Sequence, residues 1–206
     1  MIIIKSVDAK TILDSRGEKT ILISIKTNAG DFSASAPNGK SKGKYEAKSY
    51  KTSLEKDIET MKKFSDYFSE ELLEKFEDLK RAEDILEGHV GANTLFAFES
   101  AVLKAIAGEQ KIEVWELINP KANTLKGTSK IPRLVGNCVG GGKHSSSSRK
   151  PDFQEFLLIP HLKSAKENFE KNKSAKKEVE EILRKTDAKF EGKKTDENAW
   201  MTSLNE

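Results

Sequence analysis

GNCVGGGKHSSSSRKPDFQEFLLIP, residues 136–160, joins two short apolar runs through a glycine-rich loop. The loop carries Lys143 and His144, and the second apolar run contains Gln154 and Glu155. Glycines give a loop backbone freedom, which suits a segment that closes over a ligand. A carboxylate at a strand end, beside a loop with His and Lys, predicts an acid/base site for an anionic substrate. The alternative is a linker followed by a strand.

The composition favours a soluble cytoplasmic protein. The 206 residues include 36 basic and 33 acidic side chains, and the net charge of +3 is spread along the chain, so we expect no nucleic-acid partner. The single cysteine, Cys138, excludes an intramolecular disulfide and suits a reducing compartment. Only three isoleucines precede the first charge, too few for a signal peptide or a membrane span, so we expect no membrane association.

Three amino-terminal segments have the composition of β-strands: 2–7, 19–27 and 31–36. The second of them places an isoleucine at every other position, which is the period of a half-buried strand. Short polar turns separate the three segments, so we expect a three-stranded antiparallel meander.

The middle of the chain has the periodicity of helices. Thr52 and Glu55 form a capping-box pattern at the start of a first helix. A second helix is expected over about 70–86 and a third over 92–107, which Gly108 would end. Together with the meander, these helices predict an α+β domain.

A polar segment marks a change of composition near residue 127, and we place a boundary there between domains 1–127 and 128–206. Beyond the two apolar runs of the second domain, a long helix is expected over 164–185. Ser164 and Glu167 form a capping box at its start, and its apolar residues are spaced to bury one face.

Six segments carry short motifs: AKTILDSRG at 9–17, PNGKSKGKYEA at 37–47, VGANT at 90–94, GGKH at 141–144, QEF at 154–156 and DENAW at 196–200. In this order they resemble the motifs of the enolase family, and the resemblance extends over nearly the whole chain. Enolases are phosphopyruvate hydratases, lyases of glycolysis and gluconeogenesis that use two Mg²⁺ ions to interconvert 2-phosphoglycerate and phosphoenolpyruvate. The resemblance therefore implies an enzyme with this substrate pair and this metal.

The resemblance also implies a fold: an α+β amino-terminal capping domain, followed by the first ββα elements of an incomplete (β/α)8 enolase-type barrel. A barrel needs roughly 200 residues or more, and fewer than 80 follow the boundary. We therefore expect activity only when a carboxy-terminal half completes the barrel, whether this chain is a fragment or one half of a two-chain enzyme. We also expect a homo- or hetero-oligomer.

Carried over by position, Glu197 would be the acid that helps to expel hydroxide, and Glu155 its hydrogen-bonding neighbour. Loop closure would bring His144 towards the substrate phosphate, with Gln154 beside it, and Ser41 would ligate the second Mg²⁺. The three metal-binding carboxylates and the catalytic lysines of the family come later in its sequence and are not in this chain.

The chain departs from the family pattern in two places. Segment 196–200 ends in Asn-Ala-Trp where the family has Gly-Gly-Phe, which would reduce the backbone freedom of this loop. The segment from His144 to Gln154 is about two residues longer than in most of the family. These departures keep open an alternative, a non-catalytic chain derived from enolase that binds or regulates a partner. Racemase chemistry is disfavoured, because those relatives place a lysine pair where this chain has Gln154 and Glu155.

Overall fold

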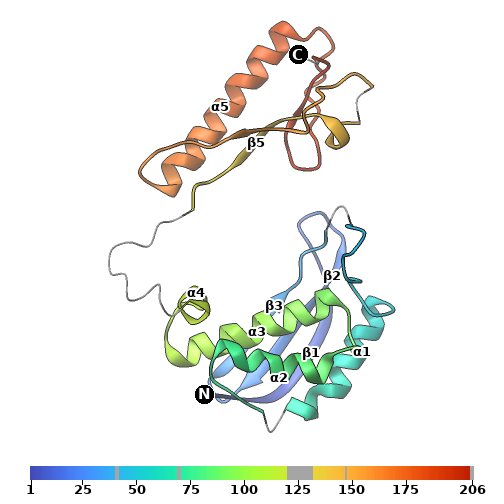
Figure 1. Ribbon diagram of the computed structural model, residues 1–206, viewed down its shortest axis with the longest axis vertical. Coiled ribbons are helices and arrows are strands. Elements are labelled where there is room, and N and C mark those ends of the chain that lie inside the picture. The colour runs from blue at the N-terminus through green and yellow to red at the C-terminus, as the bar shows by residue number, and fades with distance from the viewer. Residues whose placement is uncertain (40–41, 69–70, 120–131, 147, 205–206) are drawn as a thin grey trace. The chain divides into compact units, whose positions relative to one another are not determined.

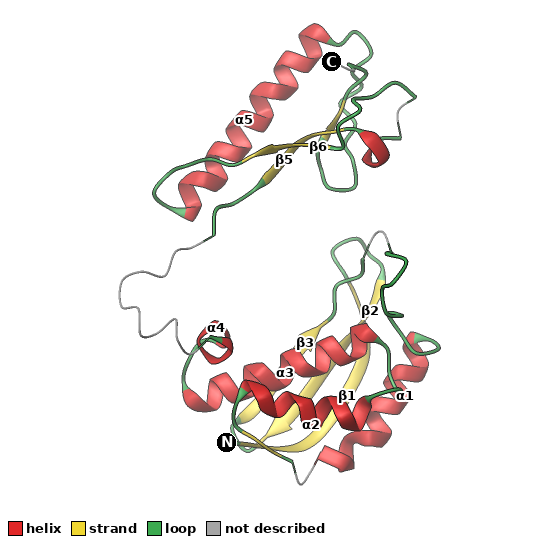
Figure 2. Cartoon of the chain, viewed as in Figure 1, coloured by secondary structure: helices red, strands yellow, loops and turns green. Residues whose placement is uncertain are grey.

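The chain forms two compact units, Met1–Gly127 and Thr128–Glu206 (Figure 1). The first unit combines an antiparallel sheet with several helices, and the second combines a smaller sheet with one long helix (Figure 2). The computed structural model of the protein describes these residues: 1–39, 42–68, 71–119, 132–146 and 148–204.

The sheet of the first unit has four strands in the order β3-β2-β1-β4. Their bounds are β1 (Ile2–Leu13), β2 (Lys19–Thr27), β3 (Gly30–Ser35) and β4 (Leu72–Leu73). β1 pairs antiparallel with β2, and β2 with β3, which confirms the predicted meander. The first strand is longer than predicted because its pairing with β2 continues as far as Leu13, opposite Lys19.

Helices cover one face of this sheet (Figure 2). Their bounds, with two 3₁₀ turns, are α1 (Leu54–Phe64), η1 (Ser65–Phe68), η2 (Phe76–Asp78), α2 (Leu79–Leu86), α3 (Ala92–Gln110) and α4 (Val114–Ile118). α1 packs on β1, and α3 packs on β2 and β3. The alternating isoleucines of β2 are buried, and the rings of Phe68 and Phe98 lie 4.7 Å apart in the same core. The α+β fold predicted for this unit is confirmed.

The helix predicted over 70–86 is wrong in its first half. Leu72 and Leu73 form β4 and pair with the start of β1, and the α-helix begins only at Leu79. Leucines spaced for a helix face also suit a short edge strand, and here the long-range pairing with β1 decides between the two.

Two helix ends also differ from the prediction. Ser53, not Thr52, caps α1, because its side chain accepts a hydrogen bond from the backbone N–H of Lys56. α3 continues past Gly108, and Lys111, with φ of 56°, ends it. Gly108 lies inside the helix for a packing reason: a Cβ atom there would come within 2.8 Å of the Phe32 ring on β3.

The second unit has a three-stranded sheet in the order β6-β5-β7. Its elements are β5 (Gly136–Gly140), η4 (Gly142–His144), β6 (Glu155–Leu158), α5 (Ala165–Thr186) and β7 (Trp200–Met201). β5 is antiparallel to β6 and parallel to β7. The capping box at the start of α5 is present, since Ser164 and Glu167 exchange hydrogen bonds. This ββα arrangement is the start of a barrel, as predicted.

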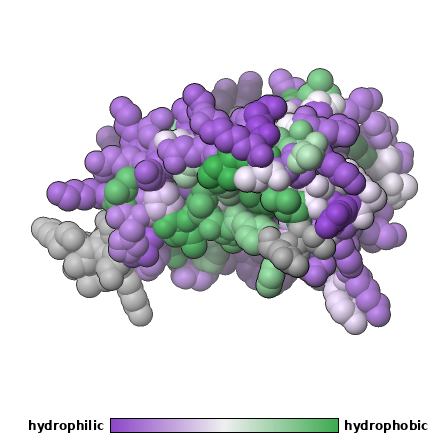
Figure 3. All heavy atoms as spheres, turned by 90° about the horizontal axis from the view of Figure 1, so that it is seen from above, coloured by the Kyte–Doolittle hydropathy of each residue, from purple (hydrophilic) through white to green (hydrophobic). Residues whose placement is uncertain are grey.

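Apolar side chains of the second unit remain exposed. The buried apolar face predicted for α5 is present only in the second half of the helix: Leu183 is buried and Ala175 and Val179 are partly buried, but Phe169 is 53% exposed. Phe156 and Leu157 of β6 are 44% and 48% exposed. The space-filling view shows hydrophobic side chains gathered in one area and bordered by hydrophilic ones (Figure 3). Three strands and one helix offer too little surface to cover these side chains.

Within the described part of the chain, no helix has the length and apolar character that a membrane span requires.

Candidate functional site

The glycine-rich loop after β5 lies against the start of β6. The N–H groups of Gly141 and Gly142 donate to the carbonyls of Gln154 and Pro151, both at 2.9 Å. A Cβ atom on Gly141 would come within 2.3 Å of the Phe153 carbonyl oxygen, and Gly142 has φ of 49°. Only glycine fits both requirements without strain. The glycines thus let the loop approach β6 closely.

This loop places His144 between two glutamates. Its Nδ1 lies 3.4 Å from Oε1 of Glu155 and 3.5 Å from Oε2 of Glu197. Its Nε2 lies 3.0 Å from the side-chain nitrogen of Gln154. Which of the two nitrogens donates depends on the imidazole tautomer, and Nδ1 is buried near the two carboxylates without a hydrogen bond to the described residues. The structure therefore brings together four of the five residues predicted for the site.

Glu197 lies at the tip of a tight turn that precedes β7. Asn198 donates its N–H to the carbonyl of Thr195 at 2.9 Å, and Thr195 donates to the carbonyl of Ala199 at 2.8 Å. Asn198 has φ of 63°, in the left-handed region that asparagine tolerates better than most residues. The turn is thus formed although a glycine of the family motif is replaced.

Trp200 follows the same turn. Its ring is larger than the phenylalanine ring of the family motif, and neighbouring residues of the second unit contact it. The indole N–H donates to the carbonyl of Lys176 on α5 at 3.0 Å. Phe190 meets the ring edge-on with centroids 5.8 Å apart, and Nζ of Lys194 lies 4.4 Å from the ring centroid. The exchange of phenylalanine for tryptophan therefore adds a hydrogen bond between the Glu197 turn and α5.

Asn137 is a site residue that the sequence analysis missed. Its side-chain nitrogen donates to Oε2 of Glu197 at 2.8 Å, so β5 holds that carboxylate in place. Its own oxygen Oδ1 is buried and makes no hydrogen bond to the described part of the protein. The available signal was a polar residue within the apolar run GNCVG.

The cluster is a poor match for Mg²⁺. One candidate ligand atom each from His144, Glu155 and Glu197 lie within 4.8 Å of one another. Mg²⁺ prefers oxygen ligands in an octahedron, whereas an imidazole with two carboxylates suits a transition metal better. Ser41, predicted as a Mg²⁺ ligand, lies outside the described residues. This chain therefore does not offer a complete Mg²⁺ site among the residues described.

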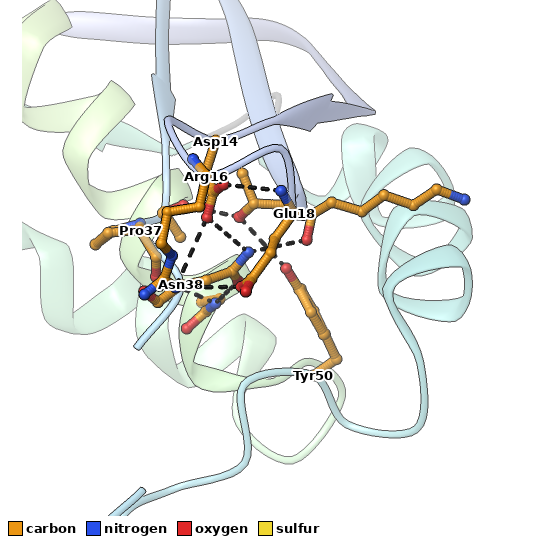
Figure 4. A network of polar contacts seen from close by, with 10 residues as sticks. Asp14, Arg16, Glu18, Pro37, Asn38 and Tyr50 are labelled. Carbon is orange, nitrogen blue, oxygen red and sulfur yellow. Dashed lines mark hydrogen bonds and ion pairs between the residues drawn. The ribbon is translucent and has the colours of Figure 1, made fainter. Parts of the chain in front are cut away.

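The first unit anchors one end of the loop that contains Ser41. Asp14 accepts backbone hydrogen bonds from Arg16 and Glu18, both at 2.9 Å, and a side-chain hydrogen bond from Asn38 at 3.2 Å (Figure 4). Arg16 in turn donates to the Asn38 carbonyl at 2.9 Å. These hydrogen bonds, the one from the Glu18 N–H above all, hold the pKa of the Asp14 carboxyl below its usual value. The turn at Asp14 therefore positions the start of the loop.

The sequence of this chain is similar to the sequences of known enolases. The family model of the enolase amino-terminal domain matches residues 4–118. The enolase of Methanothermobacter thermautotrophicus is 30% identical, over 98% of this chain and 49% of that enolase. The enolase of Methanosphaera stadtmanae is 28% identical with the same coverage, and cytosolic enolase 3 of Arabidopsis thaliana is 28% identical over 77% of this chain and 36% of that protein.

The chain spans about half the length of the curated relatives it matches. The amino-terminal domain model covers more than half of the chain, and the two archaeal alignments extend over both units. This chain belongs to the enolase family.

Proposed function

We propose that this chain is the amino-terminal half of an enolase that interconverts 2-phosphoglycerate and phosphoenolpyruvate. In this assignment residues 1–127 are the amino-terminal domain and residues 128–206 begin the barrel. The observation that carries the proposal is the convergence of His144, Glu155 and Glu197, whose ligand atoms lie within 4.8 Å of one another. An imidazole beside two carboxylates is suited to proton transfer.

The proposal gives each of these residues a role. Glu197 donates the proton that lets hydroxide leave as water. Asn137 and His144 both approach its Oε2 atom, which assigns Oε1 to the substrate. Glu155 lies beside the same ring nitrogen, Nδ1, and keeps a second negative charge next to the imidazole, while Gln154 contacts the other ring nitrogen. This arrangement leaves the imidazole able to turn towards the substrate phosphate when the loop closes.

Two Mg²⁺ ions complete the proposed enzyme, and most of their ligands come from the carboxy-terminal half. Bound there, they would stabilise the negative charge that develops when the proton beside the substrate carboxylate is removed. Ser41 would be the ligand that this chain contributes to the second ion. The catalytic lysine that removes the proton also comes from the other half.

We further propose that the carboxy-terminal half is a separate polypeptide, and that the two halves assemble in the cytoplasm. The observation that supports a partner is the exposure of apolar side chains on β6 and α5. Covering Phe156, Leu157 and Phe169 would contribute about 25 cal/mol for each Å² of apolar surface removed from water. One relative bears the name cytosolic enolase, which fits the proposed location.

The test is co-expression with a carboxy-terminal half, followed by an assay of Mg²⁺-dependent phosphoenolpyruvate formation by ultraviolet absorbance. We expect activity in the co-purified complex and none in either half alone. Glu197→Gln should lower kcat by roughly 10²- to 10⁴-fold, the usual contribution of a positioned acid. Glu181→Gln, on an exposed part of α5, is the matched control and should leave activity unchanged. Full activity of the Glu197→Gln complex would contradict the assigned mechanism.

The second candidate is a non-catalytic chain derived from enolase that binds or regulates a partner. The observation that favours it is the poor match between the His/Glu/Glu cluster and Mg²⁺. A stable complex with a carboxy-terminal half that forms no phosphoenolpyruvate would support this candidate.

A further inference from the structure

A pocket of about 340 Å³ lies beside β7 in the second unit and shares no residue with the candidate active site. One wall is the loop after β5, and another is the segment that follows β7. β5 and β7 are parallel, so their carboxyl ends meet at one edge of the sheet, where α/β proteins commonly bind ligands. The volume is at the lower end of the range for small-molecule sites.

The charge of the pocket favours an anion. Its lining includes three basic side chains, Arg149, Lys189 and Lys193, and one acidic side chain, Glu191. The lining therefore has a net charge of +2. Lys193 pairs with Glu191 at 2.5 Å, which raises the pKa of Lys193 and keeps it cationic. Serines of the Ser145–Ser148 run, Ser146 and Ser148, add hydroxyl groups to the same wall. Cations and hydroxyls in a small pocket are typical partners of a phosphate group.

The opposite wall favours a ligand hydroxyl. Thr202 and Ser203 donate their hydroxyl protons to the buried Asp187, at 2.6 Å and 2.5 Å. With its proton committed, each hydroxyl oxygen can serve a ligand only as an acceptor, and the Thr202 oxygen already accepts from the Leu204 N–H at 3.2 Å. Glu191 is also an acceptor. One side of the pocket thus suits phosphate oxygens, and the other suits a group that donates hydrogen bonds.

We propose that this pocket binds a small phosphate monoester that carries a hydroxyl group. The phosphate contacts Arg149, Lys189 and Lys193, and the hydroxyl donates to Thr202, Ser203 or Glu191. The site is additional to the proposed active site and does not depend on it. It also gives a function to the serine- and arginine-containing segment that the catalytic proposal leaves unused.

The test follows backbone amide chemical shifts of the full chain during titration with glycerol 3-phosphate, inorganic phosphate and glycerol at constant ionic strength. We expect saturable shifts at Thr202 and Ser203 with glycerol 3-phosphate, roughly fivefold weaker binding of inorganic phosphate, and no shifts with glycerol. Equal affinity for the two phosphates would overturn the assignment to a monoester. The absence of saturable shifts at these amides would overturn the site.

Variants separate this pocket from the active site. Lys193→Gln should weaken glycerol 3-phosphate binding roughly tenfold, and Lys193→Arg should retain it. The matched control, Lys177→Gln on an exposed part of α5, should have no effect, and neither should His144→Ala. An unchanged Trp200 fluorescence spectrum verifies that each variant is folded. Equal weakening by Lys177→Gln, or loss of binding only in His144→Ala, would overturn the proposal.

Discussion

Helices α3 and α5 are of similar length, 19 and 22 residues, but they are packed very differently within their units. Phe98 on α3 is fully buried against the sheet of the first unit, whereas Phe169 on α5 is 53% exposed. α3 buries eight of its residues and α5 buries two. The first unit is therefore a closed α+β domain, and the second is the start of a barrel whose described residues leave part of its apolar surface uncovered within the unit.

The two helices must therefore be stabilised by different interactions. Each large apolar side chain that α3 buries, namely Phe98, Val102 and Ile106, contributes about 1.5–3 kcal/mol. α5 depends more on its capping box and on surface ion pairs such as Arg184–Glu180, each contributing a few tenths to about 1 kcal/mol. We expect from this comparison that local helix signals alone do not make a stable unit, and five predictions test it.

The largest expected effect is the difference in stability between the two units. The chain has two tryptophans, Trp115 in the first unit and Trp200 in the second, so each unit carries its own fluorescent probe. In Trp115→Phe the remaining Trp200 reports on the second unit, and in Trp200→Phe the remaining Trp115 reports on the first unit. In urea the second unit should unfold first, and the free energies of unfolding of the two units should differ by at least about 4 kcal/mol. Coincident transitions in the two variants would contradict the comparison.

The second prediction concerns a buried carboxylate that joins two helices of the first unit. Asp57 on α1 accepts hydrogen bonds from the N–H groups of Lys51 and Gly91 and from the Thr94 hydroxyl, at 2.7–3.1 Å. Asp57→Ala leaves these donors unpaired and should lower the free energy of unfolding by about 3 kcal/mol. Urea denaturation followed by Trp115 measures the loss. Glu59→Ala, which removes an exposed ion pair, is the control and should cost less than about 1 kcal/mol.

Acid should unfold the second unit through Asp187. Burial would raise the pKa of this carboxyl, but hydrogen bonds from Ser203, Thr202 and Lys189 outweigh burial and lower the pKa well below 3.8. A lowered pKa in the folded state gives stability that is present above about pH 4 and lost as the pH falls further. Asp187→Asn should remove this acid dependence and cost about 2 kcal/mol at pH 7. Trp200 fluorescence against pH is the measurement, and an unchanged acid midpoint in the variant would refute the prediction.

The first unit should respond to pH in the opposite direction. Burial, with the Glu83 carboxyl beside it, raises the pKa of Glu99 on α3 from 4.5 to about 7. The stability that the protonated form provides is present below pH 4.5 and is lost as the pH rises through 7. Because Glu99 is partly exposed, we expect a loss of only about 1 kcal/mol. Glu99→Gln should abolish this dependence in denaturation followed by Trp115, and Glu77→Gln, an exposed control, should retain it.

A similarly small effect is expected at the Glu197 turn. Asn198→Ala places a less tolerant residue at φ of 63° and should cost about 1 kcal/mol in Trp200-detected denaturation. Asn198→Gly should be neutral or slightly stabilising, because glycine adopts this conformation freely. A neutral Asn198→Ala would mean that the turn does not depend on the left-handed residue.

The sequence predicted features that depend on neighbouring residues. The alternation in β2 predicted the meander, and Ser164 with Glu167 predicted the start of α5, because strand period and helix caps involve residues a few positions apart. The motifs predicted that His144, Gln154, Glu155 and Glu197 belong to one site. Their roles in catalysis stay predictions until the assay is done.

Only the tertiary structure decided features that join distant residues. Leu72 and Leu73 form a strand because β1 pairs with them, and Gly108 lies within α3 because the Phe32 ring packs against it. Asn137 binds Glu197 across 60 residues of chain. No local pattern encodes such contacts, since their free energy comes from pairing and packing between segments that meet only after folding.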